Sequence, residues 1–93
     1  MLTDDEVQAA LVDLPGWSIE HVSPRRVVKE FRFPGFAAAI HFVDRVAERA
    51  ERADHHPDLD IRFSMVRVAL STHSAGGVTD LDVALAREIE ALA

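Results

Sequence analysis

The sequence predicts an α+β fold in which a four-stranded antiparallel sheet carries three helices on one face, in the order α-β-β-α-β-β-α. Two observations lead to this prediction. Apolar residues recur at helical spacing in three separate segments, and in the segments between them apolar and polar residues alternate. The alternating segments come in two pairs, each followed by a single helix, which favours antiparallel pairing. The 93 residues are expected to form one domain that spans positions 1–93.

The first helix is expected to begin at Thr3. Thr3 and Glu6 have the spacing of a capping box, and the acidic residues between them suit the positive end of a helix. Pro15 and the glycine that follows it end this helix. A short strand over 17–22 and a longer strand over 25–33 come next, separated by a turn.

The segment 36–53 is the clearest helix in the sequence. One apolar stripe is expected to face the core, and it consists of Phe36, Ile40, Val43, Ala47 and Ala50. The helix must end before His56, because Pro57 disfavours helical geometry at the residue that precedes it. Two half-buried strands follow, one around 59–63 and one over 66–73, and we expect them to form a hairpin.

A third helix is expected after Thr79, which caps it, with an apolar face made of Val83, Ala86, Ile89 and Leu92. If the helices lie on one side of the sheet, the strand faces that carry Arg62, Arg67 and Ser71 point away from them. A partner subunit or a ligand could use that polar face.

Composition and charge argue against several classes of function. Asp and Glu outnumber Lys and Arg by 16 to 10, and the formal net charge of -6 argues against direct binding to nucleic acid. No apolar run approaches the roughly 20 residues that span a bilayer, so no contact with a membrane is expected. The chain has no cysteine, which excludes disulfides, thiolate ligands and cysteine nucleophiles. Together with an N-terminal segment unlike a signal peptide, these features predict a cytoplasmic protein.

Four residues at the ends of predicted elements form the main candidate site. His55 and His56 leave the central helix, His73 ends the last strand, and Asp82 lies in the first turn of the last helix. Functional sites are commonly built where elements end and loops gather. Each residue also has a purely structural interpretation: His55 can complement a helix C-terminus, Asp82 can complete a cap with Thr79, and His73 can lie on the surface. The pattern alone leaves both interpretations open.

A metal site is a second interpretation of this cluster, since three histidines and a carboxylate can hold zinc. However, adjacent side chains of an extended segment point to opposite faces, and the cluster has no histidine pair at i and i+4. Nucleophilic catalysis has weaker support, because Ser71 and Ser74 flank His73 without any resemblance to a nucleophile elbow. The spacing thus gives little support to either a metal site or a nucleophile.

The spacing of these residues resembles the signature of the pterin-4a-carbinolamine dehydratase family. The sequence has His-His-Pro at 55–57, then five residues and the aromatic Phe63, then nine residues and His73, then eight residues and Asp82. The segments "LPGW" at 14–17, "KEFRF" at 29–33 and "VAERAE" at 46–51 are also similar to the family. The resemblance extends from Thr3 to Leu92. It departs from the family at Leu59 and Phe63, where tryptophan and tyrosine are frequent, which concerns substrate fit more than reaction class.

The resemblance implies a hydro-lyase that converts a 4a-hydroxytetrahydropterin to the quinonoid dihydropterin and water, and so recycles the pterin cofactor of aromatic amino acid hydroxylases. It implies that the enzyme itself needs neither a metal nor a cofactor. It implies that His55 and His73 transfer protons, that His56 mainly holds the substrate, and that Asp82 orients a histidine. Histidine suits such work because its charge changes near neutral pH. The implied catalytic set is His55, His56, His73 and Asp82, and the implied substrate contacts are His56, Asp58, Phe63, Ser71 and Thr72.

The resemblance also implies partners and an alternative function. The partners are the pterin substrate and further copies of the chain, in a homodimer or a homotetramer. The alternative is a non-catalytic, dehydratase-like interaction module, acting as an assembly factor or a transcriptional coactivator. An intact set of three histidines and an aspartate favours the enzyme, because an interaction module has no need of it.

Overall fold

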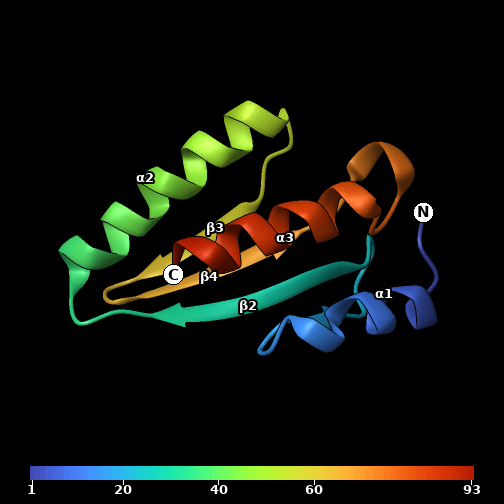
Figure 1. The fold of residues 1–93 in the computed structure, drawn as a ribbon, viewed down its shortest axis with the longest axis horizontal. Coiled ribbons are helices and arrows are strands. Elements are labelled where there is room, and N and C mark those ends of the chain that lie inside the picture. The colour runs from blue at the N-terminus through green and yellow to red at the C-terminus, as the bar shows by residue number, and fades with distance from the viewer.

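A computed structural model describes residues 1–93 and confirms the predicted fold class (Figure 1). The three helices are α1 (Asp4–Ala10), α2 (Phe36–Ala53) and α3 (Asp80–Leu92), and the four strands are β1 (Ser18–Glu20), β2 (Arg26–Arg32), β3 (Asp58–Arg62) and β4 (Met65–Leu70). Two short 3-10 turns, η1 (Leu11–Asp13) and η2 (His73–Ala75), follow α1 and β4. None of the helices combines the length and the apolar character that crossing a bilayer requires.

The strands form one antiparallel sheet in the order β1-β2-β4-β3. β3 and β4 are joined as the predicted hairpin, and β2 pairs with β4 in a register that places Val27 opposite Leu70 and Phe31 opposite Val66. This register directs the apolar residues of both central strands to the same side. β3 occupies one edge of the sheet and pairs only with β4.

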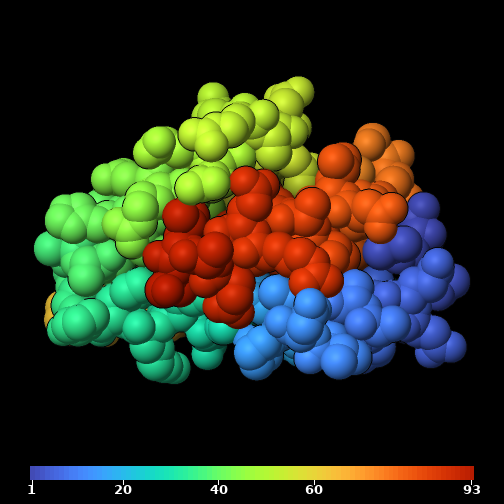
Figure 2. Space-filling model, viewed as in Figure 1, coloured from blue at the N-terminus to red at the C-terminus, as the bar shows by residue number.

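The helices cover the apolar side of the sheet. Figure 2 shows α3 between α2 and the N-terminal segment on this face of the molecule. The fully buried side chains of the two central strands and of α3 meet here, among them Val27, Val66, Val68, Leu70, Leu85 and Ile89. Burial of a valine, leucine or isoleucine contributes about 1.5–3 kcal/mol, so this layer is the main source of stability.

The predicted apolar stripe on α2 is wrong in part. The buried residues of this helix are Ala39, Phe42, Val46 and Ala50. Phe36, which was expected in the core, is 53% exposed. Phe42 instead packs between two aromatic rings from the sheet side, with ring centroids 4.8 Å from Phe31 and 4.9 Å from Phe33. Contacts with these rings set the rotation of α2, and the helical repeat alone does not contain that information.

A polar cluster joins the N-terminal region to the sheet and to α3. The Lys29 ammonium donates to both carboxylate oxygens of Glu90, at 2.6 and 2.9 Å, and the Trp17 indole donates to the same carboxylate at 3.2 Å. Gly16 allows this approach, because a Cβ atom there would lie 2.9 Å from Cε of Lys29 and its φ is +88°. These contacts hold the C-terminal part of α3 over the sheet.

The opposite face of the sheet carries charged side chains. Arg26 and Arg67 both pair with the Glu20 carboxylate. The hydrogen bond from Arg67 is the main reason that the pKa of Glu20 lies below its usual range, and the charges of Arg67 and Arg26 lower it further. Arg67 points away from the helices, as expected, because it alternates along β4 with the buried Val66 and Val68.

Candidate active site

A small pocket lies where the end of α2 meets the segment that follows β4. Its volume is about 300 Å³, and it is lined by Asp54, His55, His56, Ser71, Thr72, His73 and Ser74. The helix ends here because Asp54 adopts a left-handed conformation, with φ 49°, as the C-cap of α2. The chain leaves the helix at this point, and the two adjacent histidines turn toward different elements of the protein.

His55 is held by a buried carboxylate from another element. Its Nε2 atom lies 2.5 Å from Oδ1 of Asp82, whose side chain is fully buried, while the His55 side chain is 11% exposed. The two residues are 27 positions apart in the chain. A carboxylate only accepts hydrogen bonds, so Nε2 of His55 carries the proton and Nδ1 is the ring nitrogen available for exchange.

The Asp82 carboxylate is also part of the capping box of α3. Its second oxygen, Oδ2, accepts hydrogen bonds from the backbone N–H of Thr79 and from the hydroxyl of Thr72, each at 2.8 Å. Burial of a carboxylate is tolerable when its oxygens are hydrogen-bonded in this way. The capping interpretation of Asp82 and the functional one therefore describe the same side chain, since one oxygen caps the helix and the other contacts His55.

The two remaining histidines have different surroundings. His56 turns toward the last turns of α2, where its Nε2 atom lies 2.5 Å from the Glu51 carboxylate, and both side chains are largely exposed. His73 is exposed at the start of η2, and its ring has no hydrogen-bond partner. The three histidines thus line one pocket but differ in their partners. His55 contacts a buried carboxylate, His56 contacts an exposed carboxylate, and the His73 ring contacts neither.

The structure brings some of the predicted substrate contacts to this pocket and leaves others outside it. Ser71 and Thr72 line the pocket together with the histidines. Asp58 and Phe63 are not among the lining residues. Asp58 begins β3, and that strand carries the chain roughly 15 to 20 Å away before it reaches Phe63. Phe63 lies at the tip of the hairpin, 75% exposed and with φ 51°, so within one protomer it is remote from the histidines.

Two residues that the sequence did not mark as site candidates, Asp54 and Glu51, contribute to the site, and so does Thr79, which was expected only as a helix cap. Asp54 lines the pocket as the C-cap of α2, Glu51 pairs with His56, and the hydroxyl of Thr79 lies 2.7 Å from that of Thr72. Asp54 could have been identified from the sequence, because it is an acidic residue directly before the two histidines. No sequence signal connects Thr72 with Thr79, because their contact depends on how the loop between them folds.

The zinc interpretation finds no support in the geometry. No group of three or more His, Cys, Asp or Glu side chains is arranged so that it could hold a metal ion. His55 is committed to Asp82 and His56 to Glu51, and these two contacts draw the adjacent rings apart.

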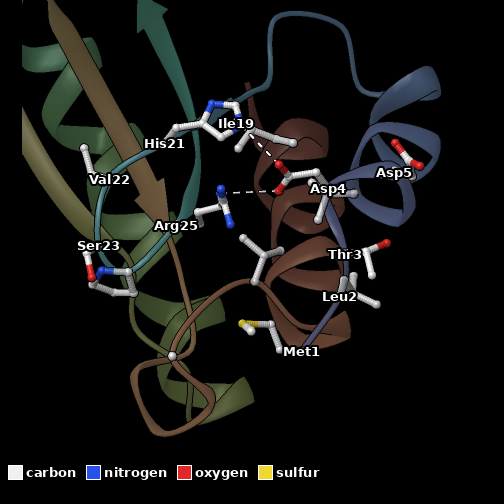
Figure 3. A pocket seen from close by; sticks show the side chains of 14 residues that line it. Met1, Leu2, Thr3, Asp4, Asp5, Ile19, His21, Val22, Ser23 and Arg25 are labelled. Atoms are coloured by element: carbon white, nitrogen blue, oxygen red, sulfur yellow. Dashed lines mark hydrogen bonds and ion pairs between the residues drawn. The ribbon is translucent and has the colours of Figure 1, made fainter.

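A larger cavity, of about 730 Å³, lies between the N-terminal segment and the turn that joins β1 to β2 (Figure 3). Figure 3 shows His21 and Arg25 converging on Asp4, with atom separations of 3.3 and 3.4 Å. These two side chains already pair with a carboxylate of the chain itself. The cavity contains none of the residues of the histidine pocket, so we place the candidate site at the smaller pocket.

Comparisons with known proteins identify the family to which this chain belongs. A family model described as pterin 4 alpha carbinolamine dehydratase matches residues 1–92. A relative from Mycobacteroides abscessus is 53% identical over 90 residues, which cover 97% of this chain and 93% of the relative. A relative from Nocardia farcinica is 53% identical over 93 residues, which cover 100% of this chain and 95% of the relative. Both provisionally carry the name pterin-4-alpha-carbinolamine dehydratase.

Two solved structures are similar in fold. One, described as a transcriptional coactivator/pterin dehydratase from Brucella melitensis, superposes with a TM-score of 0.93 at 38% identity and covers 99% of this chain and 97% of that one. The other, a pterin dehydratase-like protein described as a RuBisCO assembly factor in the alpha-carboxysome, has a TM-score of 0.70 at 24% identity, covers 83% of this chain and 88% of that one, and shares the fold. With a family match over nearly its whole length and relatives at about half identity, this chain belongs to the pterin-4-alpha-carbinolamine dehydratase family.

Proposed function

We propose that this protein dehydrates a 4a-hydroxytetrahydropterin to the quinonoid dihydropterin, and so recycles the pterin cofactor of an aromatic amino acid hydroxylase. The observation that carries the proposal is the pairing of His55 with a buried carboxylate, beside the unpartnered ring of His73 in the same pocket. The reaction breaks the bond between carbon 4a and its hydroxyl oxygen and removes the proton on N5. One water molecule leaves, and no oxidant or reductant is consumed.

The two histidines supply the acid and the base that this reaction needs. Hydroxide is a poor leaving group, so an acid must protonate the hydroxyl while the lone pair on N5 expels it. We assign this step to His55, because the Asp82 carboxylate holds Nε2 of the ring and leaves Nδ1 free to face the substrate. We assign removal of the N5 proton to His73, whose ring is free of other partners. Positioned acids and bases of this kind typically contribute about 10²- to 10⁴-fold to a rate.

His56 and Ser71 are the proposed substrate contacts in the pocket. Both line it, and His56 can hold the pterin while its Nε2 atom stays on Glu51. The predicted contacts of Asp58 and Phe63 with substrate stay predictions, because neither lines the pocket of this protomer.

A dehydration assay tests the proposal. An aromatic amino acid hydroxylase generates the 4a-hydroxytetrahydropterin, and the quinonoid product is followed by its absorbance. We expect wild-type protein to accelerate dehydration, His73→Ala to lose about 100-fold or more of this acceleration, and His41→Ala to retain it. His41 is an exposed histidine on α2 and controls for loss of any surface imidazole. Equal rates for folded wild type and His73→Ala would contradict the assignment of His73.

A second candidate function is a non-catalytic interaction module. The observation that favours it is the charged sheet face, which carries Arg26, Arg67 and Glu20 and which no helix covers. The Brucella structure is described as a coactivator as well as a dehydratase. The assay above separates the two functions, since a folded wild-type protein that leaves the spontaneous rate unchanged would favour the interaction module.

We further propose that the protein works as a homodimer or homotetramer in the cytoplasm, with residues 1–93 acting as one unit. Ile61 on the edge strand β3 and Phe63 in the adjoining hairpin are exposed apolar side chains, and an unpaired strand edge favours association. Light scattering on the purified protein measures this directly, and a mass equal to one chain at micromolar concentration would contradict it.

A further inference from the structure

We propose that Thr72 is a positioning residue, whose hydroxyl fixes the Asp82 carboxylate so that its other oxygen faces His55. This inference rests on the proposed function only for its effect on rate, because the geometry of His55 can be measured without any substrate. The hydroxyl oxygen of Thr72 lies 2.8 Å from Oδ2 of Asp82 and 2.7 Å from the hydroxyl oxygen of Thr79.

The direction of every hydrogen bond in this cluster follows from the chemistry of its members. The Asp82 carboxylate only accepts, so the single hydroxyl proton of Thr72 is donated to Oδ2. Thr72 therefore accepts from the hydroxyl of Thr79. The Thr79 oxygen in turn accepts from the backbone N–H of Leu81, at 3.3 Å. The chain of donors runs from the first turn of α3 through two hydroxyls to the carboxylate, and each bond polarises the next in the same sense.

The backbone holds Thr72 in place for this role. Its N–H donates to the carbonyl of Gly77 at 2.8 Å, and its own carbonyl accepts from Ala75 and Gly76, each at 3.0 Å. These bonds close the loop that contains η2. Threonine is β-branched, so the side chain has few accessible rotamers once the backbone is fixed. A hydroxyl that is already held in one position loses little entropy when it bonds to the carboxylate.

Thr72 also connects the two proposed proton-transfer groups. It directly precedes His73, and the backbone bonds of Thr72 anchor the turn in which His73 lies. Its hydroxyl acts on His55 through Asp82. One residue therefore sets where His55 stands relative to His73. Because its only hydroxyl proton is given to Asp82, this role differs from the direct substrate contact that the sequence predicted for Thr72.

The test compares Thr72→Val, which keeps the shape and removes the hydroxyl, with Thr72→Ser, which restores it. We expect Thr72→Val to lower kcat roughly 10- to 100-fold with little change in KM, since small displacements of a catalytic group have effects of this size. Thr72→Ser should recover most of the rate. Thr3→Val removes a threonine hydroxyl from the other capping box and should leave kcat unchanged.

A second readout does not depend on activity. The ¹⁵N and ¹H NMR signals of the His55 ring report whether Nε2 donates to a carboxylate. We expect the proton on Nε2 to be protected from exchange in wild type, Thr72→Ser and Thr3→Val, and to exchange faster in Thr72→Val. If Thr72→Val does not fold, Thr79→Ala replaces it, because that change removes the donor to Thr72 and leaves Thr72 intact.

The outcomes separate this inference from the proposed function. Unchanged kcat and an unchanged His55 signal in Thr72→Val would overturn the positioning role. A raised KM with unchanged kcat would also overturn it, and would identify Thr72 as a substrate contact instead. If wild type shows no dehydration, the proposed function fails, and the NMR comparison alone then decides whether Thr72 positions His55.

Discussion

The protein contains the same local motif at the start of two helices. Residues 3–6 read Thr-Asp-Asp-Glu before α1, and residues 79–82 read Thr-Asp-Leu-Asp before α3. In both cases the threonine hydroxyl accepts from a backbone N–H of the first turn, and the acidic side chain three residues later accepts from the threonine N–H. The two capping boxes therefore stabilise their helices in the same way.

The two boxes differ in what surrounds the acidic residue. Glu6 is exposed, and within the protein its carboxylate contacts only Thr3, at 2.9 Å. Asp82 is fully buried, and it contacts Thr79, Thr72 and His55. A cap holds a carboxylate in a defined place, and burial beside a histidine then gives that carboxylate a second role. A helix cap can therefore be a structural detail or part of an active site, according to what packs against it.

The largest expected difference between the two boxes comes from neutralising the acid in each. Asp82→Asn should lower kcat for dehydration by about 100-fold or more and the free energy of unfolding by about 1–3 kcal/mol, because the amide turns N–H groups toward donors. Glu6→Gln should leave kcat unchanged. The dehydration assay and urea unfolding measure both quantities. Equal losses of activity in the two variants would break the distinction.

A smaller difference is expected from the threonines. Thr3→Ala and Thr79→Ala should each lower the free energy of unfolding by about 1 kcal/mol, because each removes an N-cap side chain. Thr79→Ala should also lower kcat about tenfold. It removes the hydrogen bond from Thr79 to Thr72, which supports the bond from Thr72 to Asp82, and the free energy of one such bond corresponds to a factor of about ten in rate. Thermal unfolding and the dehydration assay measure these effects. A kcat for Thr79→Ala equal to that of Thr3→Ala would show that the Thr79 hydroxyl acts only as a cap.

The smallest expected effect is on the titration of Glu6, in the exposed capping box at the start of α1. The backbone and side-chain hydrogen bonds from Thr3 hold the pKa of Glu6 below its usual range. A carboxyl with a lowered folded pKa contributes stability above its unfolded pKa, and this contribution is lost as the pH falls through the folded value. An NMR titration of the Glu6 carboxyl carbon should show the lowered midpoint, and Thr3→Ala should raise it toward the ordinary value. A midpoint in the ordinary range in wild type would contradict this account.

Much of the fold followed from local patterns. The helix predicted over 36–53 has those bounds in the structure, because its start after Pro34-Gly35 and its end before Pro57 are marked by residues that interrupt helices. The predicted strands are confirmed with ends shifted by a few residues, except for the strand predicted over 66–73. That strand ends at Leu70, Thr72 bonds with Gly77, and His73 begins the turn η2 instead of ending the strand. Strand ends depend on pairing partners, which a local pattern does not specify.

The sequence predicted which residues form the candidate site better than it predicted how those residues contact one another. The spacing of the histidines and Asp82 identified the four residues that resemble the family signature. It did not separate His55, paired with a buried acid, from His56, paired with an exposed one. It also grouped Phe63 with the histidines, although β3 carries Phe63 to the far end of the hairpin.

The sequence by itself determined the order of the elements, the fold class, both capping boxes and the identity of the histidines, because these depend on periodicity and on short-range hydrogen bonds. Only the tertiary structure decided which face of α2 is buried, which capping box is buried, and which histidine meets its carboxylate. Those outcomes depend on contacts between residues far apart in the chain, such as Phe31 with Phe42 and His55 with Asp82. Such contacts form only when the helices pack on the sheet and water is excluded between them.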